Sequence, residues 1–202
     1  MINLNEFFGD IDIYLFDQIL KNRFSPGMKI LDAGCGGGRN IVYFLRSGFE
    51  VFGVDQNAEA IEYVRSLAQM LAPENSPENF QILGVEKMPF ADESFDVVIS
   101  SAVLHFADNE TQFNQMLDEM FRVLKPFGLL FARLASSIGI ENKVKQIAER
   151  RYFLPDGSER FLVDERMLTD ATRKLNATFV EPIKTTNVQN LRCMTTWVIR
   201  KN

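Results

Sequence analysis

The sequence has few of the residues that cross-link a small fold or bind a transition metal, with two cysteines and one histidine among 202 residues. Cys35 and Cys193 lie far apart and form no C-x-x-C spacing, which argues against a disulfide framework and a structural zinc site. His105 alone cannot build a metal centre from several histidines, and we expect no metal ion. Reduced cysteines are typical of a cytoplasmic protein.

Positive charge is also scarce, because the formal net charge is -5 and lysine and arginine form no continuous run. A nucleic-acid partner would require such a basic surface, so we expect none. The longest mostly apolar stretch is FDVVISSAVLHFA, which is too short to span a bilayer. The start, MINLNEFFGD, lacks the features of a secretion signal. We therefore expect a cytoplasmic protein without a membrane partner.

The composition is that of an ordinary globular domain, with 46% hydrophobic and 24% charged residues. Apolar stretches of strand length alternate with helical segments up to about residue 135. This alternation predicts a mainly parallel sheet with helices on both faces. The expected strands are 29–32, 50–54, 80–83, 95–100 and 128–135, and the expected helices begin at about 41, 57 and 108.

The regular alternation stops after about residue 136. Residues 140–151 are polar and predict a solvated helix. Two apolar arms then flank Pro155-Asp156-Gly157, a pattern typical of a β-hairpin. No repeat and no flexible linker marks a domain boundary, so we interpret 1–202 as a single domain with a cap on the substrate side at 137–163.

The C-terminal segment predicts one helix and two strands. Asp164 is a suitable N-cap for a helix that reaches Leu175. The segments 178–188 and 192–200 have the composition of strands and predict an antiparallel pair that closes the chain.

Glycine is concentrated in the stretch ILDAGCGGGRN, which follows a predicted strand and holds four glycines in five positions. Such bare backbone usually serves a positive φ or the close approach of a ligand. The next predicted strand ends at Asp55, about 20 residues further on, where a carboxylate can accept both ribose hydroxyls. Together the two features predict a site for an adenosine-containing ligand.

The loop lacks the residues of two common nucleotide-binding patterns. A dinucleotide loop of the form G-x-G-x-x-G would need glycine where the chain has Arg39. A P-loop would need G-K-[ST], which is absent. The loop reads D-x-G-x-G-x-G from Asp32 onwards, and an acid at this place suits an ammonium or sulfonium ligand better than a pyrophosphate.

As a set, the glycine loop, Asp55 and the stretch MPFADESFDVVIS at 88–100 resemble the class I S-adenosylmethionine-dependent methyltransferases. The resemblance runs from about Met28 to Ala135. The loop and the ending RCMTTWVIRKN are also similar to small methyltransferases labelled tellurite-resistance type. The resemblance implies an α/β, Rossmann-like fold with a seven-stranded mixed sheet, in the order 3-2-1-4-5-7-6 with the last strand antiparallel, and helices on both faces.

The resemblance also implies a binding site for S-adenosylmethionine. Gly34 and Gly36 would let the loop pass under the methionine part of the cofactor, with Cys35 packed between them. Asp32 would lie near the amino group of the methionine part. Asp55 would hold the ribose diol.

For the adenine, the resemblance implies contacts from Gln56 on one side and from Val85 and Glu86 on the other. Relatives commonly carry an acid at the position of Gly84, so Glu86 or the backbone is expected to replace it at the adenine amino group. Ser100 and the residues after it would face the methyl group.

Methyl transfer from a sulfonium requires aligned reactants and a dry site rather than a covalent nucleophile. His105 is a candidate general base for a hydroxyl or thiol acceptor, or else a packed histidine under the cap. Tyr14 is a candidate to close over the cofactor, or else part of an amphipathic helix face. Arg133 is a candidate to meet an acidic substrate, or else an ion-paired arginine.

These observations predict a methyltransferase that uses S-adenosylmethionine and acts on a small molecule. The chain has Ser100-Ser101-Ala102-Val103 after the fourth strand rather than an N-P-P-Y motif, which argues against adenine in DNA and glutamine in proteins as targets. Two other interpretations stay open: a nucleotide-dependent oxidoreductase with the same type of sheet, and a protein that binds the cofactor without catalysis.

Overall fold

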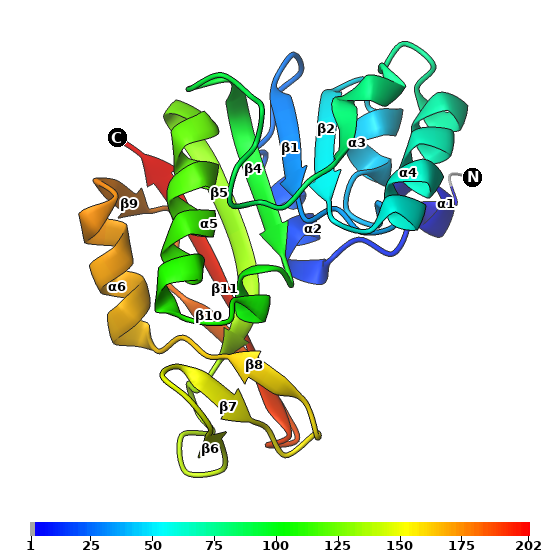
Figure 1. Ribbon diagram of the computed structural model, residues 1–202. Coiled ribbons are helices and arrows are strands. Elements are labelled where there is room, and N and C mark those ends of the chain that lie inside the picture. The colour runs from blue at the N-terminus through cyan, green and yellow to red at the C-terminus, as the bar shows by residue number, and fades with distance from the viewer. Residues whose placement is uncertain (1–2) are drawn as a thin grey trace.

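The computed structural model describes residues 3–202 and has one large sheet between two layers of helices (Figure 1). The helices are α1 (Leu4–Phe8), α2 (Ile13–Leu20), α3 (Val42–Arg46), α4 (Ala58–Leu71), α5 (Glu110–Val123) and α6 (Glu165–Lys174), with 3-10 turns η1 (Pro77–Asn79) and η2 (Leu104–Phe106). The large sheet holds β1 (Lys29–Ala33), β2 (Glu50–Asp55), β3 (Phe80–Ile82), β4 (Phe95–Ser101), β5 (Leu124–Ser136), β9 (Ala177–Phe179), β10 (Lys184–Val188) and β11 (Arg192–Lys201). The small sheet holds β6 (Lys145–Gln146), β7 (Arg151–Phe153) and β8 (Glu159–Phe161).

The large sheet has the strand order β10-β11-β5-β4-β1-β2-β3, and β9 pairs with the far end of β11. The strands β1 to β5 are parallel, and β11 runs antiparallel to β5. This arrangement confirms the order 3-2-1-4-5-7-6 with an antiparallel last strand. The carboxyl ends of five parallel strands therefore meet at one edge, which is where ligands bind in open α/β sheets.

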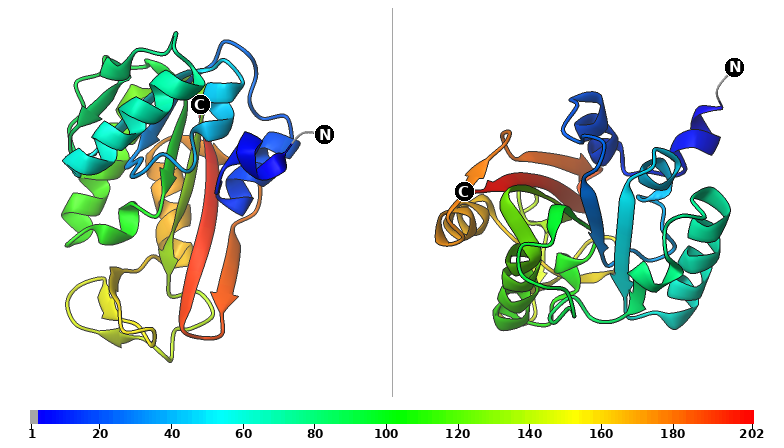
Figure 2. Two further views of the ribbon diagram at one scale, coloured as in Figure 1. Left: turned by 90° about the vertical axis from the view of Figure 1, so that its right-hand side faces the viewer. Right: turned by 90° about the horizontal axis from the view of Figure 1, so that it is seen from above.

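Strand residues alternate between two buried cores, as expected for a sheet covered on both faces. In β4, Val97 and Ile99 pack in the core with α2, α3 and α4, while Val98 packs in the core with α5 and α6. Figure 2 shows these layers on opposite sides of the sheet. The only tryptophan, Trp197 on β11, is fully buried, and its Nε1 donates to Thr172 Oγ1 on α6 at 3.0 Å.

The predicted helix starts at Asn57 and Asp164 are confirmed, and Asp164 is the N-cap that was predicted. The Asn57 side chain accepts from the amides of Glu59 and Ala60 at the start of α4, and Asp164 accepts from the Met167 amide at the start of α6. These caps satisfy amides that have no partner inside the helix. Both predictions depended on residues next to each other in sequence.

The predicted helix at 140–151 is wrong. The segment forms turns, the short strand β6 and the first residue of β7, and most of its side chains are exposed; Ile140 is buried, and Val144, Arg150 and Arg151 are half-buried. A helix of this length needs tertiary packing of its apolar face, and here Ile147 and Ala148, which would share such a face with Ile140 and Val144, are exposed. The hairpin around Pro155-Asp156-Gly157 is confirmed as β7 and β8, which pair antiparallel. The small sheet lies beyond the carboxyl end of β5 (Figure 1).

The two C-terminal strands pair antiparallel as predicted, but the first of them is interrupted. The expected strand 178–188 is divided into β9 and β10, with Pro182 in the gap between them. Proline has no amide proton for a strand ladder, which accounts for the break. Likewise β5 begins at Leu124, before the expected start at 128, with Phe127 at φ 62° and a register shift against β4. Within residues 3–202, no helix is long and apolar enough to cross a membrane.

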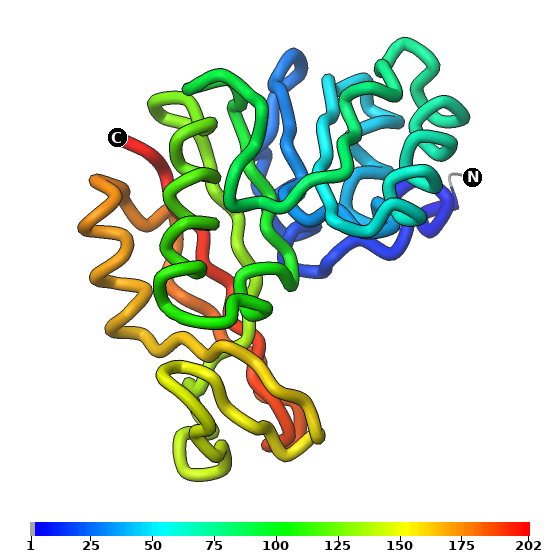
Figure 3. Tube along the Cα trace, viewed as in Figure 1, coloured from blue at the N-terminus to red at the C-terminus, as the bar shows by residue number. Residues whose placement is uncertain are grey.

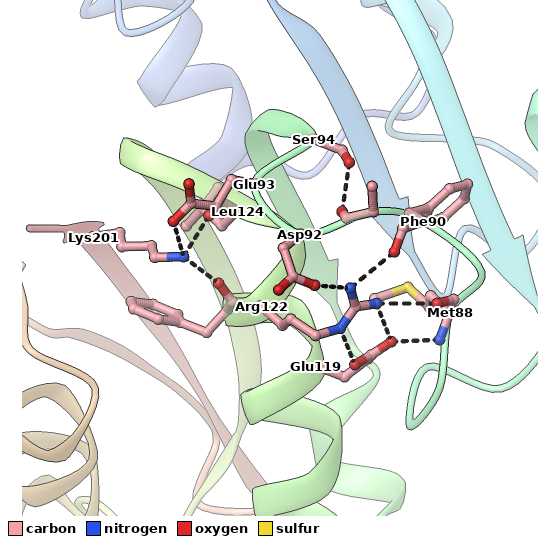
Figure 4. A network of polar contacts seen from close by, with 11 residues as sticks. Met88, Phe90, Asp92, Glu93, Ser94, Glu119, Arg122, Leu124 and Lys201 are labelled. Atoms are coloured by element: carbon pink, nitrogen blue, oxygen red, sulfur yellow. Dashed lines mark hydrogen bonds and ion pairs between the residues drawn. The ribbon is translucent and has the colours of Figure 1, made fainter.

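The loop between β3 and β4 is held against α5 by a polar network (Figure 4). Arg122 donates to the carbonyls of Met88 and Phe90 and to the carboxylate of Glu119. Glu119 in turn accepts from the Met88 amide at 2.6 Å. The residues directly after β3 lead into this loop. The network therefore also fixes the chain that follows β3 at the carboxyl edge of the sheet.

Replacing Arg122 with alanine should lower the free energy of unfolding by about 1.5–3 kcal/mol, because several charge-assisted hydrogen bonds to this loop are lost. Urea unfolding monitored by circular dichroism measures the change. Arg173→Ala is the matched control: this arginine, with a side chain 76% exposed, pairs only with Asp170 on its own helix. We expect the control to change stability by less than about 0.5 kcal/mol. Equal effects in both variants would contradict the role of the network.

Candidate functional site

A cavity of about 720 Å³ opens at the carboxyl edge of the parallel strands. It lies between the glycine loop, the ends of β2 and β3, and the segment from the end of β4 into α5. Its walls combine bare backbone, apolar side chains and a few charged groups. The lining residues are Gly34, Cys35, Gly36, Gly37, Arg39, Asn40, Asp55, Gln56, Leu83, Val85, Glu86, Ser101, Ala102, Val103, Phe106, Asp108, Gln112 and Met116.

The glycine loop connects β1 to α3 and presents its backbone to the cavity. The amide of Gly34 donates to the Val54 carbonyl at 2.8 Å, which anchors the loop to β2. A Cβ at Gly34, where φ is 87°, would come within 2.4 Å of the Val103 side chain, so only glycine fits. A Cβ at Gly36 would meet nothing within 4 Å. The loop is therefore anchored at one glycine and open at another.

Asp55 ends β2 and supports the loop from the side. One carboxylate oxygen accepts from the Gly36 amide at 2.8 Å, and the other accepts from the Asn57 amide at 2.9 Å. Each oxygen keeps a further lone pair, and the residue lines the cavity. Asp55 can therefore hold the loop and accept hydrogen bonds from a diol at the same time.

Asp32 is a buried acid without a partner. Its side chain lies near the end of β1 and is not among the residues that line the cavity, and neither carboxylate oxygen has a hydrogen-bond partner among residues 3–202. Burial raises the pKa of Asp32 to about 7, with Arg39 opposing and Asp55 reinforcing the shift. An ionised carboxylate without a partner is costly in such a place, and a cationic ligand group would remove this cost. This orphaned acid next to the glycine loop fits the amino group of a methionine moiety.

At the other end of the cavity, Gln56, Val85 and Glu86 line the wall as predicted for an adenine site. Glu86 accepts from the Gln112 side chain at 2.6 Å. A Cβ at Gly84 would lie only 2.5 Å from the second Glu86 oxygen. The carboxylate of Glu86 thus occupies the space of a side chain at 84, and its contact with an adenine amino group stays a prediction.

The end of β4 turns sharply into the cavity wall. Ser100 is buried, its Oγ has no partner among residues 3–202, and it does not line the cavity. The following residues do line it, and Ala102 takes the left-handed φ of 64° while its amide donates to the Arg133 carbonyl. The structure therefore brings Ser101, Ala102 and Val103 to the cavity wall and leaves Ser100 out of it, and their place beside a methyl group stays a prediction.

His105 is not brought to the cavity. It is buried, and its Nδ1 accepts from the Ala135 amide at 3.1 Å. Burial, together with the charge of Arg160, lowers the pKa of His105 to about 4. The unprotonated nitrogen of this neutral ring is already occupied. The role of general base therefore finds no support in the arrangement and stays a prediction.

Tyr14 also lies outside the cavity lining. Its hydroxyl group is 2.6 Å from Thr186 Oγ1 on β10, and the Arg133 guanidinium lies over its ring at 5.1 Å. Arg133 donates to the buried carboxylate of Asp12 at 3.0 Å. These contacts match the packing and ion-pair interpretations of the two residues, and closure of Tyr14 over a cofactor stays a prediction.

Cys35 lines the cavity within the glycine loop. Burial and the nearby carboxylates of Asp32 and Asp55 raise the pKa of its thiol, so the sulfur stays protonated. A protonated, buried thiol is a weak nucleophile. Its place agrees with the predicted packing role inside the loop.

Several lining residues were not identified from the sequence. Arg39 donates to Ser101 Oγ at 3.1 Å and lies 3.6 Å from the Asp12 carboxylate, so it links the loop to the segment before α2. Figure 3 shows this N-terminal segment passing the carboxyl edge of the sheet. Phe106 and Gln112 come from η2 and α5. Arg39 directly follows the glycine loop in sequence, and this position could have identified it as a lining residue. No sequence signal identifies Phe106 or Gln112, which reach the cavity only through the fold of the chain.

The chain matches the model of the methyltransferase domain family over residues 31–132. The matched segment holds the glycine loop, Asp55 and the turn after β4, which are the features that build the cavity. An uncharacterised methyltransferase of Synechocystis is 35% identical over 106 residues, which is 52% of this chain and 46% of that protein. The aligned part thus spans about half the length of the curated relatives that it matches.

Solved structures share the fold across nearly the whole chain. A SAM-dependent methyltransferase of Methanosarcina mazei has a TM-score of 0.71 and 20% identity, covering 91% of this chain and 96% of that one. The 1,6-didemethyltoxoflavin N1-methyltransferase of Burkholderia thailandensis has a TM-score of 0.70 and 22% identity, covering 91% of this chain and 75% of that one. From the family match and the architecture of the cavity, the chain belongs to the methyltransferase domain family, in the class I S-adenosylmethionine-dependent type.

Proposed function

We propose that the chain transfers a methyl group from S-adenosylmethionine to a small-molecule acceptor. The observation that carries this proposal is the buried, unpartnered carboxylate of Asp32 next to an open glycine loop. A dinucleotide phosphate would be repelled by an acid there, whereas the ammonium of a methionine moiety would give this carboxylate an ion-pair partner. Asp55 at the end of the neighbouring strand supplies the acceptor for a ribose.

In this proposal, Asp32 holds the amino group, Asp55 the ribose hydroxyls, and Gln56 and Glu86 border the adenine. The bound cofactor would supply a methyl group on a cationic sulfur. The turn at 101–103 forms the wall against which an acceptor is aligned, and alignment of two reactants can contribute roughly 7–11 kcal/mol to lowering the barrier. No covalent nucleophile is required of the protein.

A small-molecule acceptor is favoured by the size of the cavity and by the absence of a basic surface run in the sequence. The Burkholderia enzyme with the same fold holds 1,6-didemethyltoxoflavin together with S-adenosylhomocysteine. The same charge pattern supports a protein without a nucleic-acid partner, and the two free cysteines support a cytoplasmic location. The insertion at 137–163 would act as a cap on the acceptor side of the single domain.

Calorimetric titration with S-adenosylhomocysteine and with NADH tests the proposed cofactor. We expect binding of the first ligand and none of the second, whereas binding of NADH alone would support an oxidoreductase. Turnover of S-adenosylmethionine with a panel of thiols, phenols, amines and oxyanions of selenium or tellurium then tests catalysis. Cofactor binding with no turnover of any acceptor class would favour a binding protein.

A further inference from the structure

The two ends of the cavity are lined by different side chains, although each has an acid, since Asp108 lines the wall with Phe106. Asp55 and Glu86 line the end beside β2 and β3, which suits a cationic cofactor. The wall that follows β4 instead leads to Phe106, and the guanidinium of Arg160 lies over that ring with its Cζ 5.0 Å from the centroid.

Arg160 belongs to β8 of the small sheet and is half-buried. Its Nη1 donates to the Glu159 carbonyl, and among residues 3–202 no carboxylate lies within ion-pair distance of its guanidinium. Two arginines at the start of β7 differ in this respect. Arg150 pairs with Asp164 at 2.8 Å and Arg151 with Glu159 at 3.5 Å. Arg160 is thus a positioned cation whose Nε and Nη2 have no protein acceptor in the described chain.

Phe106 supplies an aromatic surface next to this cation. Its side chain is 57% exposed, an unusual fraction for a phenylalanine, and it faces the cavity together with Val103 and Met116. Exposed aromatic rings in a cavity wall are typical contacts for the apolar body of a ligand. A guanidinium edge is the matching contact for a carboxylate, which it can bind through two parallel hydrogen bonds.

We infer that the methyl acceptor is a small aromatic acid whose ring packs on Phe106 and whose carboxylate binds Arg160. This inference rests on the proposed function, because it names the substrate class of the same site. It also assigns a role to the small sheet, since β8 carries Arg160 onto the ring of Phe106, which lines the cavity, although Arg160 itself does not. η2 and β8, which are far apart in sequence, meet there (Figure 1).

Benzoate and its neutral isostere benzamide are the probes for this test. Each is titrated calorimetrically into the full chain, with and without saturating S-adenosylhomocysteine. We expect benzoate to bind at least roughly tenfold more tightly than benzamide, because only benzoate forms the charge-assisted hydrogen bonds. Arg160→Gln should remove this difference, and Phe106→Ala should weaken both probes.

Arg166→Gln is the matched control, because it removes the same charge from a side chain that is 92% exposed on α6. It should leave both affinities unchanged. Arg160→Lys keeps the charge without the two-pronged edge and should retain only part of the preference. Equal affinities of the two probes for the original chain, or an unchanged preference in a folded Arg160→Gln variant, would overturn the inference. Failure to bind S-adenosylhomocysteine would instead count against the proposed function, since the titrations without that ligand report on Arg160 alone.

Discussion

Replacing Asp32 with asparagine is expected to weaken binding of S-adenosylhomocysteine by roughly a hundredfold at pH 8. The variant loses the buried carboxylate that would pair with the ligand ammonium, and an amide cannot replace this charge. Binding of 5′-methylthioadenosine should stay the same, because that molecule has the adenosine but lacks the amino acid part. Calorimetric titration of both ligands measures the difference.

The raised pKa of Asp32 makes the same interaction depend on pH. In the ligand-free protein the carboxyl group is mostly protonated at pH 6, because burial raises its pKa to about 7. A cationic ligand must displace this proton, so affinity for S-adenosylhomocysteine should rise from pH 6 to pH 8 and level off above. The Asp32→Asn variant should lack this dependence. An unchanged dissociation constant in the folded variant would show that the amino group is held elsewhere.

The raised pKa of Asp32 affects the stability of the ligand-free chain in the opposite direction: ligand affinity rises with pH, whereas the free energy of unfolding falls. Between the ordinary pKa of 3.8 and about 7, the folded chain binds a proton at Asp32 that the unfolded chain does not. This group therefore makes the free energy of unfolding fall as pH rises through that window, by about 1.4 kcal/mol per unit. Asp32→Asn should be more stable than the original chain at pH 8 without ligand, as measured by urea unfolding. A less stable variant at pH 8 would contradict the orphaned state of the carboxylate.

Replacing Asp55 with alanine is expected to weaken both S-adenosylhomocysteine and 5′-methylthioadenosine, each by roughly ten- to a hundredfold. Both ligands contain the ribose, which distinguishes this variant from Asp32→Asn. The loss has a second source, because the amides of Gly36 and Asn57 lose their acceptor and the loop is no longer held in its open form. Direct titration of the two ligands measures the effect.

Asp55→Asn is the matched variant for this prediction. The asparagine keeps the size and one acceptor oxygen, so its loss of affinity should be smaller than that of the alanine variant. Thermal unfolding serves as the control for an intact fold. Normal affinity for both ligands in a folded Asp55→Ala chain would mean that the ribose is bound by other groups.

Local patterns predicted those parts of the fold that neighbouring residues determine. The cap Asp164, the helix start at Asn57 and the apolar stretch of β4 depend on positions a few residues apart, and they were confirmed. The strand order came from the resemblance to a family rather than from any local signal. Residues 140–151 were misread because their charges suit a solvated helix, and no local signal shows that a packing partner is missing.

The cofactor half of the candidate site was predictable, and the acceptor half was not. Asp32, Asp55 and the glycines occupy one continuous motif and the end of the next strand, so their positions follow from the topology. By contrast, the pairs Arg39 with Asp12 and His105 with Ala135 join residues about 30 positions apart, and only the folded chain brings them together. For this reason, His105 was a reasonable candidate base in the sequence and is an occupied, buried ring in the structure.

The single tryptophan gives the protein an internal optical reporter. Trp197 is fully enclosed between β11 and α6 and does not line the cavity, so its emission should follow loss of the fold and ignore occupancy of the site. Fluorescence can therefore serve as a readout of unfolding that is the same for the empty and the loaded chain, and ligand affinity must be read by other means.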